Sequence, residues 1–150
     1  MNLEQSRLTK QEVAEFIKSH EGVSLKPYLD TKGKWSIGIG RNLDDCGIRM
    51  DEALFMFDND INQSISDLTK VLPEWLQCPP EVQLVLIDMM FQLGIVGFCG
   101  FKKMIAAVKQ HDYNKMIEEI KDSLYAKQVP SRAEDNISRI ERVLDSVQKV

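Results

Sequence analysis

Two acidic residues near the N-terminus, Glu21 and Asp30, have the types and spacing for acid–base chemistry. Glu21 ends a predicted helix, where the negative end of the backbone dipole disfavours a second negative charge, so we expect a raised pKa. Asp30 stands in a predicted turn, where water and backbone N–H groups keep a carboxylate ionised. Two carboxyls with pKa values pushed apart suit a general acid and a base or nucleophile, as in glycosidic cleavage. On spacing alone, two acids without a chemical task are the favoured interpretation.

A third candidate, Ser36, lies on a predicted strand whose face can look back at Asp30. Its hydroxyl can hold a water molecule by donating or accepting a hydrogen bond, or it is a strand serine with no task. No His–Asp pattern supports Ser36 as a nucleophile. Neither metal-ligand spacing nor a glycine-rich phosphate loop is present, so we expect no cofactor and no metal. The cysteines Cys46, Cys78 and Cys99 have no CxxC spacing, which favours reduced thiols.

The elements that must position these residues begin with a helix over 9–21. Thr9 and Glu12 form a capping-box pattern, and Gly22 suits a left-handed cap at the other end. Residues 25–29 predict an edge strand, because Pro27 has no N–H to donate to a neighbour.

The second strand of the predicted hairpin, residues 35–40, follows a turn over 30–34 and contains two glycines. Gly38 and Gly40 weaken a strand interior. Glycines there mark a bend, or a place where another group approaches the backbone closely.

The rest of the chain predicts helices. An amphipathic helix over 50–70 precedes an almost wholly apolar and therefore buried central helix, residues 82–93, which Gly94 and Gly97 end. Asp88 and Gln92 lie four apart on one face of that helix and need polar partners where they are buried. Shorter helices are expected at 101–109, 113–124 and 132–147, the last opening on a capping box at Ser131–Glu134.

Two further residues of the helical part leave alternatives open. Arg132, in the first turn of the last helix, opposes the helix dipole unless it faces an acid or a ligand, although a solvated arginine is equally compatible. Phe91 is more often a core residue than a platform for a sugar.

Composition limits the class of protein. The 150 residues are 43% hydrophobic and 28% charged with a net charge of -4, which indicates a folded globular chain without a nucleic-acid footprint. No run reaches the roughly 18 apolar residues of a membrane span, and Met1–Gln5 show no secretory signal. The expected fold class is α+β, mainly α. We expect a β-containing lobe at about 22–50, a linking helix at 50–70, and a helical lobe at 71–150 joined by the N-terminal helix 9–21.

The segment from Glu21 to Gly40 resembles the catalytic signature of phage-type lysozymes, the endolysins of glycoside hydrolase family 24. That signature runs Glu-Gly, then Leu, Tyr and Asp, then Gly, then Thr-Ile-Gly-x-Gly. Residues 90–94 with Gly97-Phe98 are similar to the family's central helix and its exit. Residues 130–133 are similar to its Pro-x-Arg-Ala. The resemblance covers nearly the whole chain.

The resemblance implies a peptidoglycan substrate, cut at the β-1,4 bond between N-acetylmuramic acid and N-acetylglucosamine. Glu21 takes the place of the general acid, Asp30 that of the second carboxylate, and Ser36 that of a threonine that positions water. The substrate-binding positions are Phe91, Gln92 and Asn42, and Arg132 takes a supporting position that pairs with the catalytic Glu. The family's usual inversion requires carboxyls roughly 6.5–9.5 Å apart.

Three features depart from the family pattern. Ser36 lacks the methyl group that fixes the rotamer of threonine. Arg41 and Asn42 follow the last glycine, where relatives often carry His, which leaves the ion pair sometimes found there and the local subsite in doubt. The acidic net charge weakens attraction to an anionic wall.

The resemblance also implies a biological setting. We expect a monomer that is stored in the host cytoplasm, acts on the wall in the periplasm without stable membrane insertion, and depends on a holin-type permeabiliser. Two alternatives remain: a lytic transglycosylase that leaves an anhydro-sugar, and a non-enzymatic wall-binding or virion part.

Overall fold

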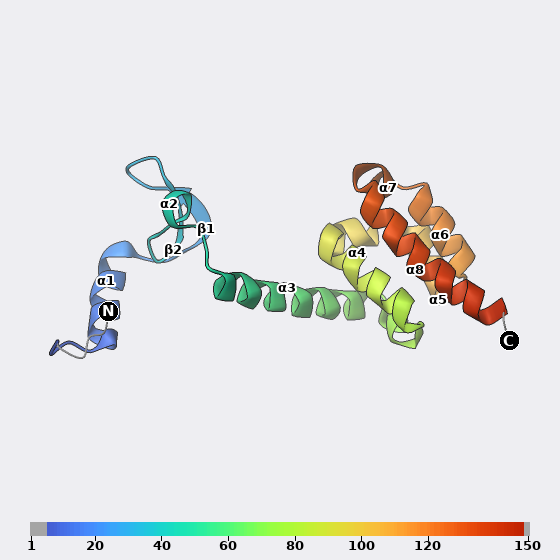
Figure 1. The fold of residues 1–150 in the computed structure, drawn as a ribbon, viewed down its shortest axis with the longest axis horizontal. Coiled ribbons are helices and arrows are strands. Elements are labelled where there is room, and N and C mark those ends of the chain that lie inside the picture. Colours follow the sequence, from blue (N-terminus) through green and yellow to red (C-terminus); the bar gives the residue numbers. More distant parts are fainter. Residues whose placement is uncertain (1–5, 149–150) are drawn as a thin grey trace. The chain divides into compact units, whose positions relative to one another are not determined.

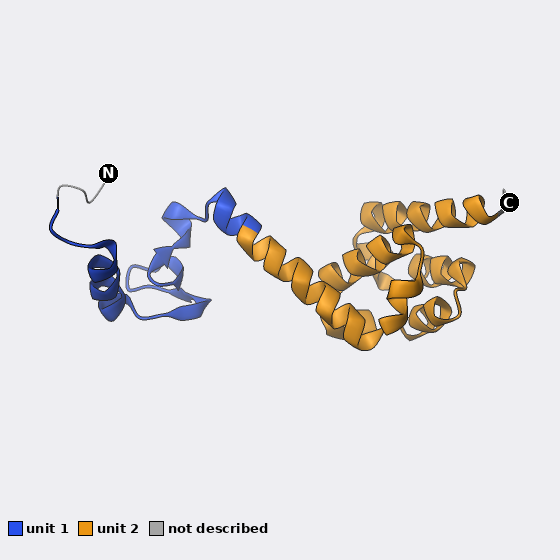
Figure 2. Ribbon diagram, turned by 90° about the horizontal axis from the view of Figure 1, so that it is seen from below, with its two compact units in different colours: residues 1–54 blue, residues 55–150 orange. Residues whose placement is uncertain are grey.

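The computed structural model describes residues 6–148, with the elements in the order shown in Figure 1. Residues 1–5, where the sequence shows no secretory signal, lie outside the described residues. The chain divides into two compact units, residues 1–54 (unit 1) and residues 55–150 (unit 2), which Figure 2 colours separately.

Unit 1 begins with helix α1, Lys10–Glu21, which matches the predicted helix 9–21 within one residue. The capping box is formed: the Thr9 hydroxyl accepts from the Glu12 N–H, and the Glu12 carboxylate accepts from the Thr9 N–H at 2.7 Å. Gly22 ends the helix at φ 69° and ψ -167°. The positive φ was expected, but the extended ψ differs from the left-handed helical cap that the sequence suggested. The chain therefore leaves α1 directly in the direction of the first strand.

A three-stranded antiparallel sheet follows in the order β1-β2-β3. Its strands are β1 Ser24–Leu29, β2 Trp35–Gly38 and β3 Arg41–Asn42. Tyr28 pairs with Ser36, and the register shifts between Ser24 and Tyr28, the stretch that contains Pro27. The edge position of β1 is as predicted, since proline cannot donate to a ladder. The third strand was not predicted, because two residues are too few to show an alternating pattern.

Two helices complete the path out of the sheet. Helix α2, Leu43–Cys46, is a single turn capped by Asn42. Helix α3, Met50–Val71, matches the predicted amphipathic helix within one residue, and the boundary between the two units falls inside it. On its buried side, Ser64 and Leu68 face the helices of unit 2.

Unit 2 is helical, and its apolar core runs from Leu68 to Val143. Its elements are the 3-10 helix η2 Pro73–Gln77 and the helices α4 Pro80–Cys99, α5 Lys102–Lys109, α6 Tyr113–Lys121, α7 Leu124–Gln128 and α8 Pro130–Gln148. Helix α4 lies at the centre beside α8 (Figure 1), with Val85, Leu86 and Met89 fully buried. The predicted central helix is thus confirmed.

Three predicted boundaries in unit 2 were wrong. Gly94 breaks the helical backbone at φ 66° and ψ 173°, but α4 resumes and ends at Cys99. The helix predicted over 113–124 ends at Lys121, and α7 follows separately. Helix α8 begins at Pro130 instead of Arg132, because proline suits a first helical turn. Ser131 therefore lies inside the helix, and the capping box predicted at Ser131–Glu134 does not form.

Helix α4 is long and apolar enough to cross a membrane, with a mean hydropathy of 1.9 over an 18-residue window. Length and composition are weak evidence for a span, because the core helix of a soluble protein passes the same test. Here Val82, Val85 and Leu86 pack in the core of unit 2 with no exposed surface. A third of that window is buried, so packing in the core accounts for part of the apolar composition.

The observed architecture, many helices with one small sheet, confirms the predicted α+β, mainly α class. The three cysteines are free, as expected. The assignment of residues 9–21 to a helical lobe stays a prediction.

Candidate active site

Asp30 is held by the turn that joins β1 to β2. Its Oδ1 accepts the backbone N–H groups of Lys32 and Lys34, both at 2.8 Å, and its own N–H donates to the Lys34 carbonyl at 2.9 Å. Within residues 6–148, no hydrogen bond is found to Oδ2. One carboxylate oxygen is therefore fixed by the turn, while the other can meet a water molecule or a ligand.

Glu21 is the last residue of α1, and its carboxyl group lies against the loop between β2 and β3. A Cβ placed on Gly40 would stand 2.6 Å from Glu21 Oε2 and 2.7 Å from Cδ. The Glu21 side chain thus occupies the space that any other residue at position 40 would fill. Of the two roles predicted for these glycines, Gly40 has that of a position where another group approaches the backbone closely. Gly38 has φ 71° and nothing within 4 Å of its Cβ position, which corresponds to the other predicted role, a bend.

The two acids consequently contact the same sheet at opposite ends of β2. Asp30 stands at the β1–β2 turn, and Glu21 lies on the β2–β3 loop. The four residues of β2 rise about 3.3 Å each, so the strand itself spans roughly 10 Å. The separation of the carboxyl groups themselves stays a prediction.

Ser36 lies in the strand between these two sites and is 3% exposed. It pairs with Tyr28 on one side and with Asn42 on the other, which places it in the middle of the sheet. Its predicted water-positioning role stays a prediction.

The two residues after Gly40 have structural partners. Arg41 donates to the Glu52 carboxylate and to the Gly47 carbonyl, so the position where relatives carry His does form an ion pair. The Asn42 side chain caps α2: its Oδ1 accepts from the Asp45 N–H at 3.0 Å, and its amide donates to the Asp45 carboxylate. Contact of Asn42 with a substrate stays a prediction.

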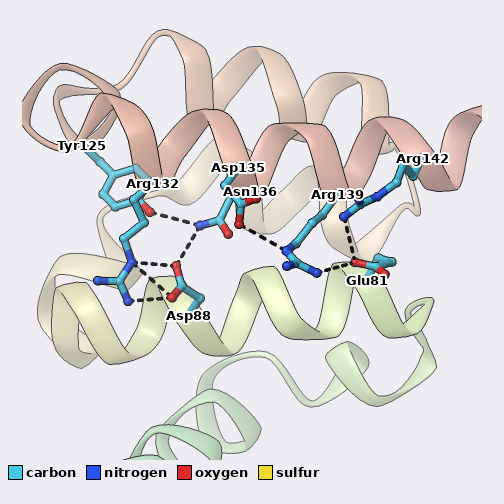
Figure 3. Close-up of polar contacts among 8 residues, drawn as sticks. All are labelled: Glu81, Asp88, Tyr125, Arg132, Asp135, Asn136, Arg139 and Arg142. Atoms are coloured by element: carbon cyan, nitrogen blue, oxygen red, sulfur yellow. Dashed lines mark hydrogen bonds and ion pairs between the residues drawn. The ribbon is translucent and has the colours of Figure 1, made fainter.

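In unit 2, Arg132 of α8 binds Asp88 of α4 (Figure 3). Its Nε donates to both carboxylate oxygens at 3.1 and 2.9 Å, and its Nη2 donates to Oδ1 at 2.6 Å. The Gln92 Oε1 accepts from Nη1 of the same guanidinium. The prediction that Asp88 and Gln92 share a face and need partners is confirmed, and Arg132 does face an acid. Its predicted pairing with Glu21 stays a prediction.

Asn136 and Tyr125 extend this cluster and were missed by the sequence analysis. The Asn136 amide donates to Asp88 Oδ2 at 2.8 Å and to the Tyr125 hydroxyl at 3.1 Å (Figure 3). Burial raises the pKa of Asp88, but hydrogen bonds from Arg132 and Asn136 outweigh burial and hold that pKa below its usual value. The signal in the sequence was the four-residue spacing of Arg132 and Asn136, which puts both on one face of a helix.

Phe91 is 38% exposed and contacts Phe57 edge to face, with ring centroids 5.8 Å apart. It is thus neither a sealed core residue nor an isolated surface ring. It borders an open hollow of about 370 Å³ in unit 2, lined by Asp60, Gln63, Ser64, Asp67, Met90, Phe91 and Gly94. Its role in substrate binding stays a prediction.

A metal has no evident place in this arrangement. Within the part of the chain that the structure describes, no three His, Cys, Asp or Glu side chains gather closely enough to hold an ion. The chemistry available to the acids above is that of proton transfer and of positioning water.

Comparison with known proteins defines the class. The phage lysozyme family model matches residues 18–133, and the chain belongs to this family. The match includes the acids of unit 1 and extends through α4 to the beginning of α8. The chain is accordingly a lysozyme, a glycoside hydrolase, which confirms the predicted enzyme class.

Individual relatives agree with this class. The chain is 25% identical to probable T4-type lysozyme 1 of Dictyostelium discoideum, over 86% of this chain and 93% of that protein. Probable T4-type lysozyme 2 of the same organism is 24% identical, over 85% and 92%. The pre-baseplate central spike protein Gp5 of Enterobacteria phage T4 is 29% identical over 81% of this chain. The chain spans 26% of the length of that spike protein.

Proposed function

We propose that this chain is a muramidase that hydrolyses the β-1,4 bond between N-acetylmuramic acid and N-acetylglucosamine in bacterial peptidoglycan. The observation that carries the proposal is the shared sheet: Glu21 rests on one end of β2, and Asp30 is anchored at the other. The family membership of the chain supports the same substrate class.

Glu21 is the general acid in this proposal. It gives its proton to the glycosidic oxygen as the bond to the anomeric carbon breaks. Asp30, whose Oδ2 is open, takes a proton from the water that attacks the anomeric carbon. Each cycle leaves Glu21 deprotonated and Asp30 protonated, and exchange with solvent restores both.

Inversion of the anomeric carbon is the stereochemical part of the proposal. A water molecule between the Asp30 carboxylate and the sugar needs carboxyls roughly 6.5–9.5 Å apart, whereas direct attack by Asp30 needs about 5 Å. The length of β2 favours the wider spacing, since the two acids stand at its two ends. In this proposal Ser36, in the middle of that strand, helps to orient the water.

The decisive experiment measures new reducing ends from purified peptidoglycan with wild type and with Glu21→Gln. The amide cannot donate the proton, so we expect a loss of about 10²–10⁴-fold, the usual contribution of general acid catalysis. Glu15→Gln is the matched control: Glu15 lies on the same helix, is exposed, and accepts a hydrogen bond from Gln11. Wild-type activity in Glu21→Gln would refute the proposed role.

Mass spectrometry of the same digests separates the hydrolase from the alternatives. A hydrolytic product carries one water more than the anhydro-sugar that a lytic transglycosylase leaves. A chain that binds the wall but releases neither product would be a wall-binding module. Both of these outcomes contradict the proposal.

The biological setting that we propose is host lysis. A monomer stored in the host cytoplasm would reach the periplasmic wall after a holin-type protein permeabilises the inner membrane. The relative Gp5 is by name a central spike protein, which makes a virion-borne lysozyme the competing setting. Detection of the chain in purified particles would favour that setting, and wall clearing only when a holin is co-expressed would favour the first.

A further inference from the structure

Gly40 lies in the short loop between β2 and β3 and has a φ of +65°. Residues that carry a side chain rarely adopt this backbone conformation. A Cβ at this position would stand 2.6 Å from Glu21 Oε2, 2.7 Å from Cδ and 3.1 Å from Cγ. The three nearest atoms all belong to one side chain, and that side chain is the proposed acid. The missing Cβ is therefore the space in which the Glu21 carboxyl group rests.

The loop that carries Gly40 is fixed on both sides. Ile37 pairs with Arg41 across the β2–β3 turn, and Ser36 pairs with Asn42. Arg41 is further held by the carboxylate of Glu52 and by the Gly47 carbonyl. The Glu21 carboxyl group thus contacts a loop whose backbone is held in place on both sides.

Glu21 itself has few other restraints. Among the described residues, no hydrogen-bond donor or acceptor is found for its carboxyl group, and the residue is exposed. Its position follows from the end of α1 on one side and from contact with Gly40 on the other. Removal of either restraint would move the carboxyl group.

We propose that Gly40 is a positioning residue for the general acid, and that its absent side chain sets where the Glu21 proton is delivered. The inference rests on the proposed role of Glu21. A methyl group at position 40 meets the tip of a flexible side chain, so the chain accommodates it by rotating Glu21 away. The cost then falls on catalytic geometry more than on folding, and small displacements of this kind reduce rates strongly.

The chain offers matched controls for the backbone strain. Gly38 has φ +71° and Gly22 has φ +69°, and a Cβ at either position meets nothing within 4 Å. Gly38→Ala therefore introduces the same kind of strain two residues away, without a collision. The difference between Gly40→Ala and Gly38→Ala isolates the contact with Glu21.

The experiment compares Gly40→Ala, Gly38→Ala, Glu21→Gln and wild type on purified peptidoglycan, with Tm measured for each. We expect similar decreases in Tm for the two alanine variants. We also expect a decrease in kcat of at least tenfold in Gly40→Ala alone, with little change in KM and with a shifted limb in its pH–rate profile. Equal activity in the two alanine variants would overturn the proposal.

Two further measurements keep the test decisive. If Gly40→Ala folds poorly, Gly40→Asn replaces it, because asparagine tolerates positive φ but still carries the Cβ. NMR titration of the Glu21 carboxyl carbon should differ from wild type in Gly40→Ala and not in Gly38→Ala. If Glu21→Gln stays active, the proposed role of Glu21 as general acid is wrong. If Glu21→Gln is inactive but Gly40→Ala matches Gly38→Ala, only the positioning role fails.

Discussion

Arg132 and Asp88, 44 residues apart in the chain, are joined by three hydrogen bonds between the guanidinium and the carboxylate. The pair links α8 to the core helix α4, and Asn136 donates a further bond to the same carboxylate. Both side chains keep about a third of their surface exposed, at 37% and 33%. Solvent therefore screens the attraction, and its contribution lies below that of a sealed ion pair.

Replacement of this acid tests the contribution directly. We expect Asp88→Asn to lower the free energy of unfolding by about 1–2 kcal/mol, because Arg132 loses its charged partner while the shape of the side chain is kept. Urea denaturation measures the change. Asp135→Asn is the control, since its pair with Arg139 is more exposed and should contribute much less. Equal effects in the two variants would contradict the special position of Asp88.

The same pair predicts how stability depends on pH. The pKa of Asp88 is lower in the folded chain than in the unfolded chain, where an aspartate titrates near 3.9. Its contribution is then fully present above about pH 4 and is lost as the pH falls through the folded value. We expect the difference in unfolding free energy between wild type and Asp88→Asn to be constant from pH 7 to about 5 and to shrink below 4. A difference that persists unchanged at pH 2.5 would contradict this assignment.

Local sequence signals predicted much of the fold. The capping box at Thr9 and Glu12 fixed where α1 begins, and Pro27 identified an edge strand. The four-residue spacing of Asp88 and Gln92 predicted their common face. In each case the physical cause lies within a few residues of the element, so a linear pattern reveals it.

The remaining features depend on contacts that a linear pattern does not contain. The partner of Asp88 is 44 residues away. Asn136 joins this pair through the packing of α8 on α4, and Tyr125 of α7 joins it through its hydrogen bond with Asn136. The capping-box pattern at Ser131–Glu134 predicted a helix from Arg132, but Pro130 takes the first helical position. The sequence predicted that the glycines of the hairpin mark either a bend or a close approach to the backbone. Only the three-dimensional structure assigns each glycine to one of these two roles.

Asp30 has a structural task in its turn as well as a proposed chemical task, and two substitutions separate them. Asp30→Asn keeps an oxygen that accepts from the Lys32 and Lys34 N–H groups, whereas Asp30→Ala removes it. We expect both variants to lose about 10²–10⁴-fold in the release of reducing ends, and only the alanine variant to lose Tm. Lys32→Ala, which leaves its backbone N–H in place, should match wild type. Full activity in Asp30→Asn would mean that Asp30 stabilises the turn and that its negative charge is not needed for catalysis.

Ser36 offers a test of the hydroxyl in the middle of the strand. Ser36→Thr restores the family's residue, and its β-branched side chain suits a strand and restricts the rotamer. We expect kcat to be kept or raised a few-fold. Ser36→Ala removes one hydrogen bond to the proposed water and should lower kcat about fivefold, since one such bond contributes roughly 1 kcal/mol.

Because Ser36 is only 3% exposed, Tm must be followed in both variants. A methyl group that does not fit the sheet would lower Tm in Ser36→Thr, and its kcat would then be read only at temperatures where the variant is folded. The informative comparison is kcat of Ser36→Ala against wild type at equal folded fraction. Equal rates there would leave Ser36 as a strand serine without a chemical task, and the water would depend on Asp30 alone.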